Sequence, residues 1–317
     1  MNRAKDVLTK SRFKGQDVFG FKGQSELYAC YRPRYPQSLI DLAVEKAPEK
    51  GTVLDVGCGT GILSIPLSKK FERVYGIDIS QSQIDKAIEK SEEFKNISYH
   101  YQNSHDIGSF VEETMEGKSI DMVTIAQTLH WLDHDLIFKL YKKYLSEGGA
   151  FAIFSYAMCS VMNQKLAETI SEEASGTESR FTAVEILNFD EEKKYSEVEE
   201  KANDAYRAFY SKIKPHFECQ RDDIDKHFEH IAFSDYFTTV EQYLKYEVKT
   251  LDINSLFQYL KSVSGYRCFL EKFPEETDPL EDLQEELMSL YTCETKEELS
   301  TKELDIVYPY HLAILKY

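Results

Sequence analysis

The first half of the chain alternates short apolar runs with longer stretches in which apolar residues recur every three or four positions. The short runs predict buried strands and the longer stretches predict amphipathic helices. Strands are expected at Thr52–Val56, Arg73–Asp78, Ile97–Tyr101, Ile120–Ala126 and Ala150–Tyr156. This alternation favours an α/β fold with a parallel sheet and helices on both faces, and right-handed crossovers place all strand carboxyl ends along one edge.

Helices are expected between these strands and in the region that follows them. One begins at Ile62, and two others cover Ser80–Ser91 and Asp133–Leu145, with Ser80 and Asp133 as plausible N-caps. Beyond residue 156 the pattern changes. Two polar-faced helices are expected there, at Val161–Ser175 and Glu191–Phe217.

The last part of the chain predicts a return to the sheet. Val240–Thr250 is compatible with a strand or a helix, and Ile306–Lys316 predicts a late strand in which Pro309 favours an edge position or a bulge. We therefore expect three regions. Residues 1–156 form the core with an N-terminal lid segment, 157–232 form a helical insertion over the strand carboxyl ends, and 233–317 complete the sheet.

Composition narrows the classes of function. Twelve of the 14 glycines precede residue 150, so the turn-rich half is the first one. The net charge of -17 counts against nucleic-acid or anionic-membrane partners. Six cysteines without a CxxC pair, and a start without an apolar leader, predict reduced thiols in a cytoplasmic protein. We expect no metal site, because His227 and His230 lie among charged residues.

The run Val53–Gly61 (VLDVGCGTG) predicts a strand, an acid and a glycine-rich turn into a helix. It lacks the GxGxxG spacing of a dinucleotide site and the GK[ST] ending of a phosphate loop. The glycines would let the backbone approach a nucleotide closely. The alternative is a tight strand-to-helix turn that binds nothing.

Polar residues follow the next three strands as well. Asp78 ends the second strand, where a carboxylate can accept hydrogen bonds from ribose hydroxyls. Ser104 and His105 follow the third strand, and Gln127 to Trp131 follow the fourth. The only tryptophan, Trp131, is expected at the edge of a pocket.

The whole pattern resembles motif I and the following motifs of the class I S-adenosylmethionine-dependent methyltransferases. The resemblance implies a doubly wound, mostly parallel, seven-stranded Rossmann-like sheet and S-adenosylmethionine as cofactor. In the family an acid usually stands near the adenine, where this chain has Ser104 and His105. The residues that the resemblance assigns to the cofactor are Tyr31, Asp55, Gly57, Cys58, Gly59, Gly61, Asp78, Ile79, Ser104, His105 and Gln127.

Three segments resemble a subgroup of this family. Residues 28–36 (YACYRPRYP) are similar to its Y-x-x-x-R-P-x-Y-P signature, and residues 126–131 (AQTLHW) to its turn after the fourth strand. Residues 259–266 (YLKSVSGY) are similar to its Y-L-R-S-W-S-A-Y segment, with Val263 and Gly265 as departures. The subgroup includes trans-aconitate methyltransferase, which implies a small carboxylic acid as substrate.

A carboxylate acceptor is already ionised at neutral pH and needs no general base. Arg32 and Arg34 are candidates to hold it, and His130 is a candidate hydrogen-bond donor, or a base for a neutral nucleophile. Trp131 and Arg34 complete the catalytic candidates. Two alternatives stay open: a methyltransferase acting on a protein partner, and a non-catalytic cofactor-binding subunit. The missing N/D-P-P-Y motif counts against methylation of nucleobases.

Overall fold

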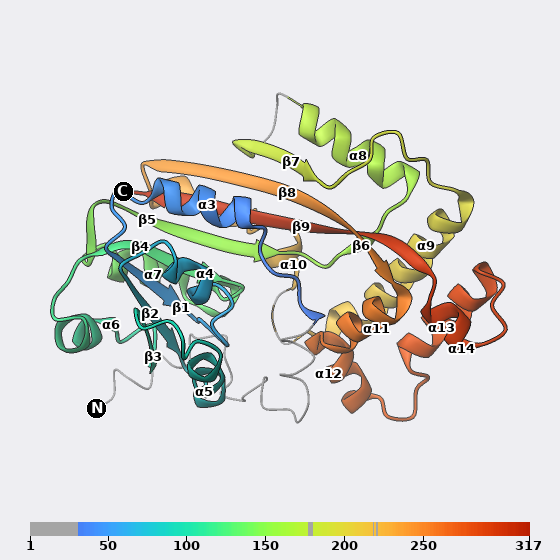
Figure 1. The fold of residues 1–317 in the computed structure, drawn as a ribbon, viewed down its shortest axis with the longest axis horizontal. Coiled ribbons are helices and arrows are strands. Elements are labelled where there is room, and N and C mark those ends of the chain that lie inside the picture. Colours follow the sequence, from blue (N-terminus) through green and yellow to red (C-terminus); the bar gives the residue numbers. More distant parts are fainter. Residues whose placement is uncertain (1–30, 177–179, 218, 220) are drawn as a thin grey trace.

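The computed structural model describes residues 31–176, 180–217, 219 and 221–317. Most of the predicted lid segment, and residues 28–30 of the tyrosine- and arginine-containing signature, lie outside these ranges. The described residues form one mixed sheet with helices packed on both faces (Figure 1).

The first four strands have the predicted bounds: β1 (Thr52–Val56), β2 (Arg73–Asp78), β3 (Ile97–Tyr101) and β4 (Ile120–Ala126). The fifth strand, β5 (Leu145–Tyr156), begins earlier than expected. Leu145 pairs with Ile120, an irregularity follows, and regular pairing starts at Ala150. The amphipathic pattern before β5 therefore overestimated the preceding helix, which ends at Tyr141.

The strand order is β3-β2-β1-β4-β5-β9-β8-β7. The first five strands are parallel, and β9 (Glu303–Lys316) lies antiparallel between β5 and β8 (Thr239–Asp252). These seven strands confirm the doubly wound, mostly parallel class, and they settle Val240–Thr250 as strand. The short strands β6 (Ser160–Val161) and β7 (Ala183–Leu187) raise the total to nine.

Pro309 lies on an interior strand, so the predicted edge position was wrong. β9 pairs with β8 along one side, where Pro309 faces Tyr246, and with β5 and β6 along the other. The Pro309 carbonyl accepts a hydrogen bond from the Ala157 N–H at 3.1 Å. The nitrogen of Pro309 faces the same side, where β5 has ended and β6 has not begun, so no ladder bond is lost there.

Two apolar layers cover the sheet. One contains α3 (Gln37–Lys46) and α4 (Ser64–Ser68), and the other contains η1 (Phe110–Thr114) and α7 (His134–Tyr141). The Asp133 carboxylate accepts a hydrogen bond from the Leu136 N–H and caps α7 as predicted. Ser80 precedes α5 but its side chain does not cap it. The remaining short elements here are α5 (Gln81–Lys90), α6 (Ile107–Ser109) and η2 (Leu129–Trp131).

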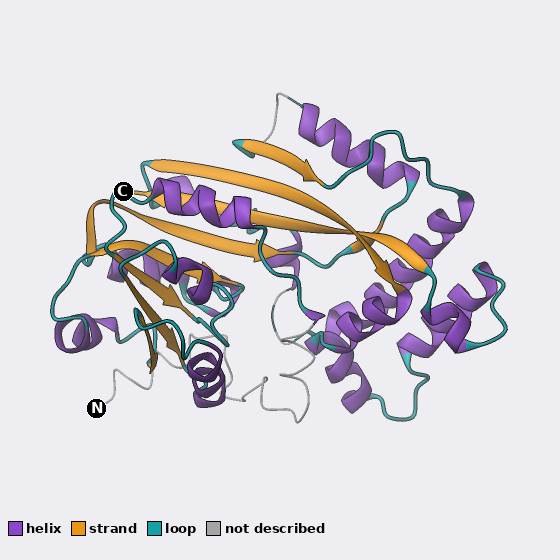
Figure 2. Cartoon of the chain, in the orientation of Figure 1, coloured by secondary structure: helices purple, strands orange, loops and turns teal. Residues whose placement is uncertain are grey.

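The region 157–232 is less uniformly helical than expected, because it also contributes β6 and β7. Its two long helices, α8 (Gln164–Ser175) and α9 (Glu197–Ile213), start at the caps Asn163 and Ser196. Between β8 and β9 the chain forms further helices, which gather with α9 at one end of the long strands (Figure 2). The remaining elements are η3 (Lys214–His216), α10 (Arg221–Asp225), η4 (Phe233–Asp235), α11 (Ile253–Lys261), α12 (Ser264–Lys272), α13 (Pro279–Leu290) and α14 (Lys296–Ser300).

Candidate cofactor and acceptor site

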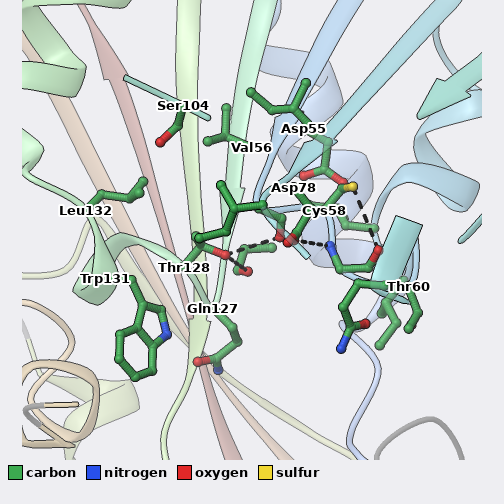
Figure 3. Close-up of a pocket in the computed structure, with 18 of the residues that line it drawn as sticks. Asp55, Val56, Cys58, Thr60, Asp78, Ser104, Gln127, Thr128, Trp131 and Leu132 are labelled. Atoms are coloured by element: carbon green, nitrogen blue, oxygen red, sulfur yellow. Dashed lines mark hydrogen bonds between the residues drawn. The ribbon is translucent and has the colours of Figure 1, made fainter. Parts of the chain in front are cut away.

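A pocket of about 640 Å³ lies at the carboxyl ends of the parallel strands. Its walls come from the ends of β1, β2, β3 and β4 and the turns after them (Figure 3). The end of β5 and the segment before α3 also line it. This is the edge at which open α/β sheets bind their ligands. Ten of the predicted site residues line it: Asp55, Gly57, Cys58, Gly59, Asp78, Ile79, Ser104, His105, Gln127 and Trp131.

The three glycines after β1 have positive φ angles but serve two purposes. A Cβ on Gly57 would clash with the Thr128 side chain, and a Cβ on Gly61 would clash with the Tyr99 hydroxyl. A Cβ on Gly59 would meet only Gln83 Oε1, at 3.8 Å, and Gly59 lines the pocket. Gly57 and Gly61 are thus required by packing, whereas Gly59 leaves space that a ligand would fill. The turn therefore fits the expected cofactor.

Asp55 is buried beneath this turn. Its two carboxylate oxygens accept hydrogen bonds from Ser64 Oγ at 2.6 Å and Thr124 Oγ1 at 2.8 Å. These bonds join β1 to the start of α4 and to β4. Burial raises the pKa of the Asp55 carboxyl to about 6, and the two hydroxyl donors only partly offset this effect.

Asp78 holds the glycine turn and also faces the pocket. Its Oδ2 accepts a hydrogen bond from the Gly59 N–H at 3.0 Å, and its Oδ1 accepts one from the Ser80 N–H at 2.9 Å. Each carboxylate oxygen has a second lone pair. The carboxylate can therefore support the turn and accept bonds from a diol at the same time.

The loop after β3 is fixed by its own hydrogen bonds. Asn103 Oδ1 accepts a bond from the His105 N–H at 2.9 Å and lies 3.1 Å from His105 Nδ1. Burial lowers the pKa of His105, which favours its neutral form. The Ser104 carbonyl accepts a bond from the Tyr141 hydroxyl at 3.0 Å. Ser104 and His105 therefore present uncharged polar groups where the family usually has an acid, and the carboxylate of this wall is that of Asp106, one position later.

Gln127 occupies a strained position at the end of β4, with a φ of 53°. Its backbone N–H donates to the Phe154 carbonyl at 2.9 Å, and its Nε2 donates to the Tyr156 carbonyl at 2.8 Å. Thr128 follows, and its hydroxyl lies 3.2 Å from the Gly57 carbonyl and 2.9 Å from the Ala126 carbonyl. These contacts attach the β4 turn to β1 on one side and to β5 on the other.

Of the two neighbouring aromatic candidates, Trp131 lines the pocket and His130 does not. His130 is only 7% exposed, and its ring centroid lies 5.1 Å from that of Trp131. The structure therefore places His130 behind the indole. From this position it can orient Trp131 but does not face the cavity.

The segment before α3 contributes residues other than the predicted ones. Arg34 is exposed and Tyr31 is 37% exposed, and neither lines the pocket. Arg32 donates to the Ser262 carbonyl at 3.1 Å and lies over the Tyr259 ring. Two of the three segments that resemble the subgroup, residues 28–36 and 259–266, thus contact each other across 230 residues.

Several lining residues were not predicted. They include Pro33, Tyr35, Asn103, Thr128, Leu132 and Tyr156. Tyr156 ends a predicted strand at the ligand-binding edge and Thr128 follows Gln127 directly, so their places in the sequence were usable signals. Gly61 was predicted to bind cofactor, but it packs on Tyr99 and does not line the pocket.

Three further observations concern the insertion at 157–232, metal ligands and membrane-spanning helices. No residue of 157–232 that the structure describes lines the pocket. Within the described ranges, no group of three or more His, Cys, Asp or Glu side chains is placed to hold a metal ion. No helix among these residues is both long enough and apolar enough to span a bilayer.

Comparisons with known proteins agree with this geometry. A family model described as a methyltransferase domain matches residues 48–205. A Dictyostelium discoideum protein named "Putative methyltransferase" is 25% identical over 311 residues, 98% of each chain. A Saccharomyces cerevisiae protein named "Probable S-adenosylmethionine-dependent methyltransferase" is 31% identical over 138 residues, 42% of this chain and 45% of that one.

A solved structure shares the fold. It is described as a "Putative Type II Methyltransferase" from Anaeromyxobacter dehalogenans. The superposition covers 89% of this chain and 97% of that structure's chain, with a TM-score of 0.60 and 19% sequence identity. The glycine turn, the sheet order and these relatives lead to one assignment: the chain belongs to the class I S-adenosylmethionine-dependent methyltransferases, with S-adenosylmethionine as its cofactor.

Proposed function

We propose that the protein transfers the methyl group of S-adenosylmethionine to a carboxylate oxygen of a small molecule. The pocket volume of about 640 Å³ lies within the range that buries a drug-sized ligand. Beside the cofactor it leaves room only for a small acceptor. This supports a metabolite over a folded protein substrate.

Strand order divides the pocket into two ends. Asp78 ends β2, and Ser104 and His105 follow β3, so we assign the cofactor's nucleoside to this side and name it the nucleoside end. The glycine turn after β1 lies between. Residues from β4, β5 and the segment before α3 face the opposite side, which we name the acceptor end: Tyr35, Gln127, Trp131 and Tyr156.

One observation carries the proposal: the acceptor end offers hydrogen-bond donors but no ordinary base. The lining carboxylates and imidazole among the described residues belong to the first three strands and their turns: Asp55 lies in β1, Asp78 ends β2, and His105 and Asp106 follow β3. A neutral amine or alcohol would need a group to take its proton as it is methylated. A carboxylate is already ionised at pH 7, so it needs none.

When bound, the cofactor supplies an electrophilic methyl group on a positively charged sulfur. The acceptor oxygen forms a bond to this carbon while the carbon–sulfur bond breaks, and the electron pair stays on sulfur. No proton is transferred. The protein's task is then to align the acceptor and exclude water, which the Gln127 amide and the rings of Tyr35, Trp131 and Tyr156 are placed to do.

The test combines binding with product chemistry. Isothermal titration should show S-adenosylmethionine binding to the full chain, and a radiolabelled methyl group should appear in an organic-extractable product when small carboxylic acids are supplied. That product should be a methyl ester, which mild alkali hydrolyses to release labelled methanol. An alkali-stable product would contradict carboxylate methylation, and binding without any transfer would favour a non-catalytic role.

A further inference from the structure

We infer that the acceptor carries a single carboxylate on an apolar or aromatic body, and is not a di- or tricarboxylic acid. This inference rests on the proposed function and specifies its substrate class. It comes from the charge and surface chemistry of the acceptor end.

The acceptor end is an aromatic wall supported from behind. The Tyr35 ring packs 5.1 Å from Phe154, 5.9 Å from Tyr156 and 6.2 Å from Tyr310, measured between centroids. Tyr35 and Tyr156 are both buried in the core while part of each faces the pocket. Rings held by their neighbours in this way cannot turn aside for a hydrated polar group. They favour an acceptor that covers them with apolar surface.

The hydrogen-bonding groups of this end are neutral. They are the Gln127 amide, the Trp131 indole and the Tyr156 hydroxyl, whereas the Tyr35 hydroxyl is buried and leaves only its ring to the pocket. Gln127 is oriented by its bond to the Tyr156 carbonyl, which uses one of the two protons on Nε2. Neutral donors of this kind can satisfy the oxygens of one carboxylate, but they supply no positive charge.

The nearby arginines do not provide that charge. Arg32 is directed to the Ser262 carbonyl and the Tyr259 ring, and Arg34 is exposed outside the pocket. Among the lining residues that the structure describes, none is a lysine or an arginine. With no cation among these described residues, the acceptor's carboxylate is paired with the cofactor's sulfonium, which carries one positive charge and balances one carboxylate.

A second or third carboxylate would find no counter-ion among the described lining residues. Burying an unpaired carboxylate is strongly unfavourable. The chain's net charge of -17 also repels polyanions as they approach. The pocket therefore selects against the additional charges as well as for the apolar body.

The direct test compares acceptors at saturating S-adenosylmethionine. Benzoate, phenylacetate and octanoate represent single carboxylates with an apolar body, acetate lacks the body, and succinate and citrate carry further charges. We expect kcat/KM for the best apolar monocarboxylate to exceed those of acetate, succinate and citrate at least tenfold. Equal or better turnover of succinate or citrate would overturn this inference and leave carboxylate methylation intact. Cofactor binding without methylation of any acid would instead overturn the proposed function.

A matched pair of variants tests the charge argument separately. Trp131 is half-buried at the pocket wall, so both Trp131→Arg and Trp131→Gln remove the indole, but only the first adds a cation. We expect Trp131→Arg to raise the ratio of citrate to benzoate turnover at least tenfold over that of Trp131→Gln. Titration with S-adenosylmethionine verifies that both variants retain the cofactor site. Equal ratios in the two variants would contradict the role of charge, and the acceptor comparison on the unmodified protein decides the inference if either variant fails to fold.

Discussion

The nucleoside end and the acceptor end of the pocket are built in different ways. At the nucleoside end and the adjoining glycine turn, backbone groups fix the geometry: the Asp78 carboxylate accepts hydrogen bonds from the amides of Gly59 and Ser80, and Gly59 leaves space for a ligand. At the acceptor end, side chains from segments more than 100 residues apart meet, with Tyr35 lying against Tyr156. Backbone requirements restrict residue identity tightly, whereas a wall of side chains can change its chemistry without altering the fold.

The largest expected effect comes from filling the space at Gly59. Gly59→Leu should weaken S-adenosylmethionine binding about 1,000-fold, close to 4 kcal/mol, because its side chain would occupy the cavity. Isothermal titration measures the loss. Gly117→Leu is the matched control, since Gly117 has a similar positive φ of 68° with no atom within 4 Å of its added Cβ. Both variants should lose about 1–2 kcal/mol of stability to backbone strain, but only the first should lose binding. Equal binding in the two would show that Gly59 is needed only for the turn.

The next effect concerns pH. Burial raises the pKa of Asp55 to about 6, above the value of about 3.9 in an unfolded chain. Between these values the folded protein binds more protons at this group than the unfolded chain does, so its contribution to the free energy of unfolding falls as pH rises. Relative to Asp55→Asn, the wild type should lose up to about 3 kcal/mol of stability between pH 4 and pH 7. Denaturant titrations at several pH values measure this difference, and parallel profiles would contradict it.

Asp78→Asn tests the nucleoside end with a change of charge at constant shape. We expect cofactor binding to weaken about tenfold, roughly 1.4 kcal/mol, because one charged acceptor becomes a donor. The exposed Asp85, which accepts a bond from Gln81 on α5, supplies the control variant Asp85→Asn. That variant should bind S-adenosylmethionine as the wild type does. If Asp78→Asn lost stability but retained affinity, Asp78 would serve the turn alone.

The smallest expected effect distinguishes strain from function at the acceptor end. Gln127→Gly removes a strained φ but also the bond to Tyr156, so stability should change by less than about 1 kcal/mol. Acceptor kcat/KM should nevertheless fall about fivefold while cofactor affinity stays constant. Glu116→Gly relieves a similar φ of 57° at an exposed turn and should leave both the acceptor kcat/KM and the cofactor affinity unchanged. A parallel loss of cofactor affinity in Gln127→Gly would place Gln127 with the cofactor instead.

The sequence predicted the strands best for β1 to β4, whose observed bounds all match the expected ones. β1 and β4 are short apolar runs bounded by turn residues. It failed where tertiary context decides. The amphipathic pattern extended the helix before β5 to Leu145, which instead pairs with Ile120. Pro309 was expected at an edge or a bulge because proline has no N–H to donate. The gap between β5 and β6 that accommodates it on an interior strand is created by pairing partners about 150 residues away, which the local pattern does not contain.

The same division holds within the pocket. Val53–Gly61 and Asp78 were identifiable because a positive φ, a close backbone approach and a carboxylate at a strand end leave local signatures. Arg34, His130 and Tyr31 were plausible by residue type, but the direction of a side chain depends on what packs around it. Tyr35 and Tyr156, which do line the pocket, come together only when the segment before α3 folds onto β5.

By itself, the sequence determined the fold class, the glycine turn and the cofactor, because these depend on residue types that few alternatives can replace. Only the tertiary structure decided which aromatic rings form the acceptor end, where Arg32 is directed, and that no described lysine or arginine lines the pocket. Those features arise from contacts between distant segments. Backbone geometry is encoded locally, whereas the chemistry of a cavity depends on every segment that closes it.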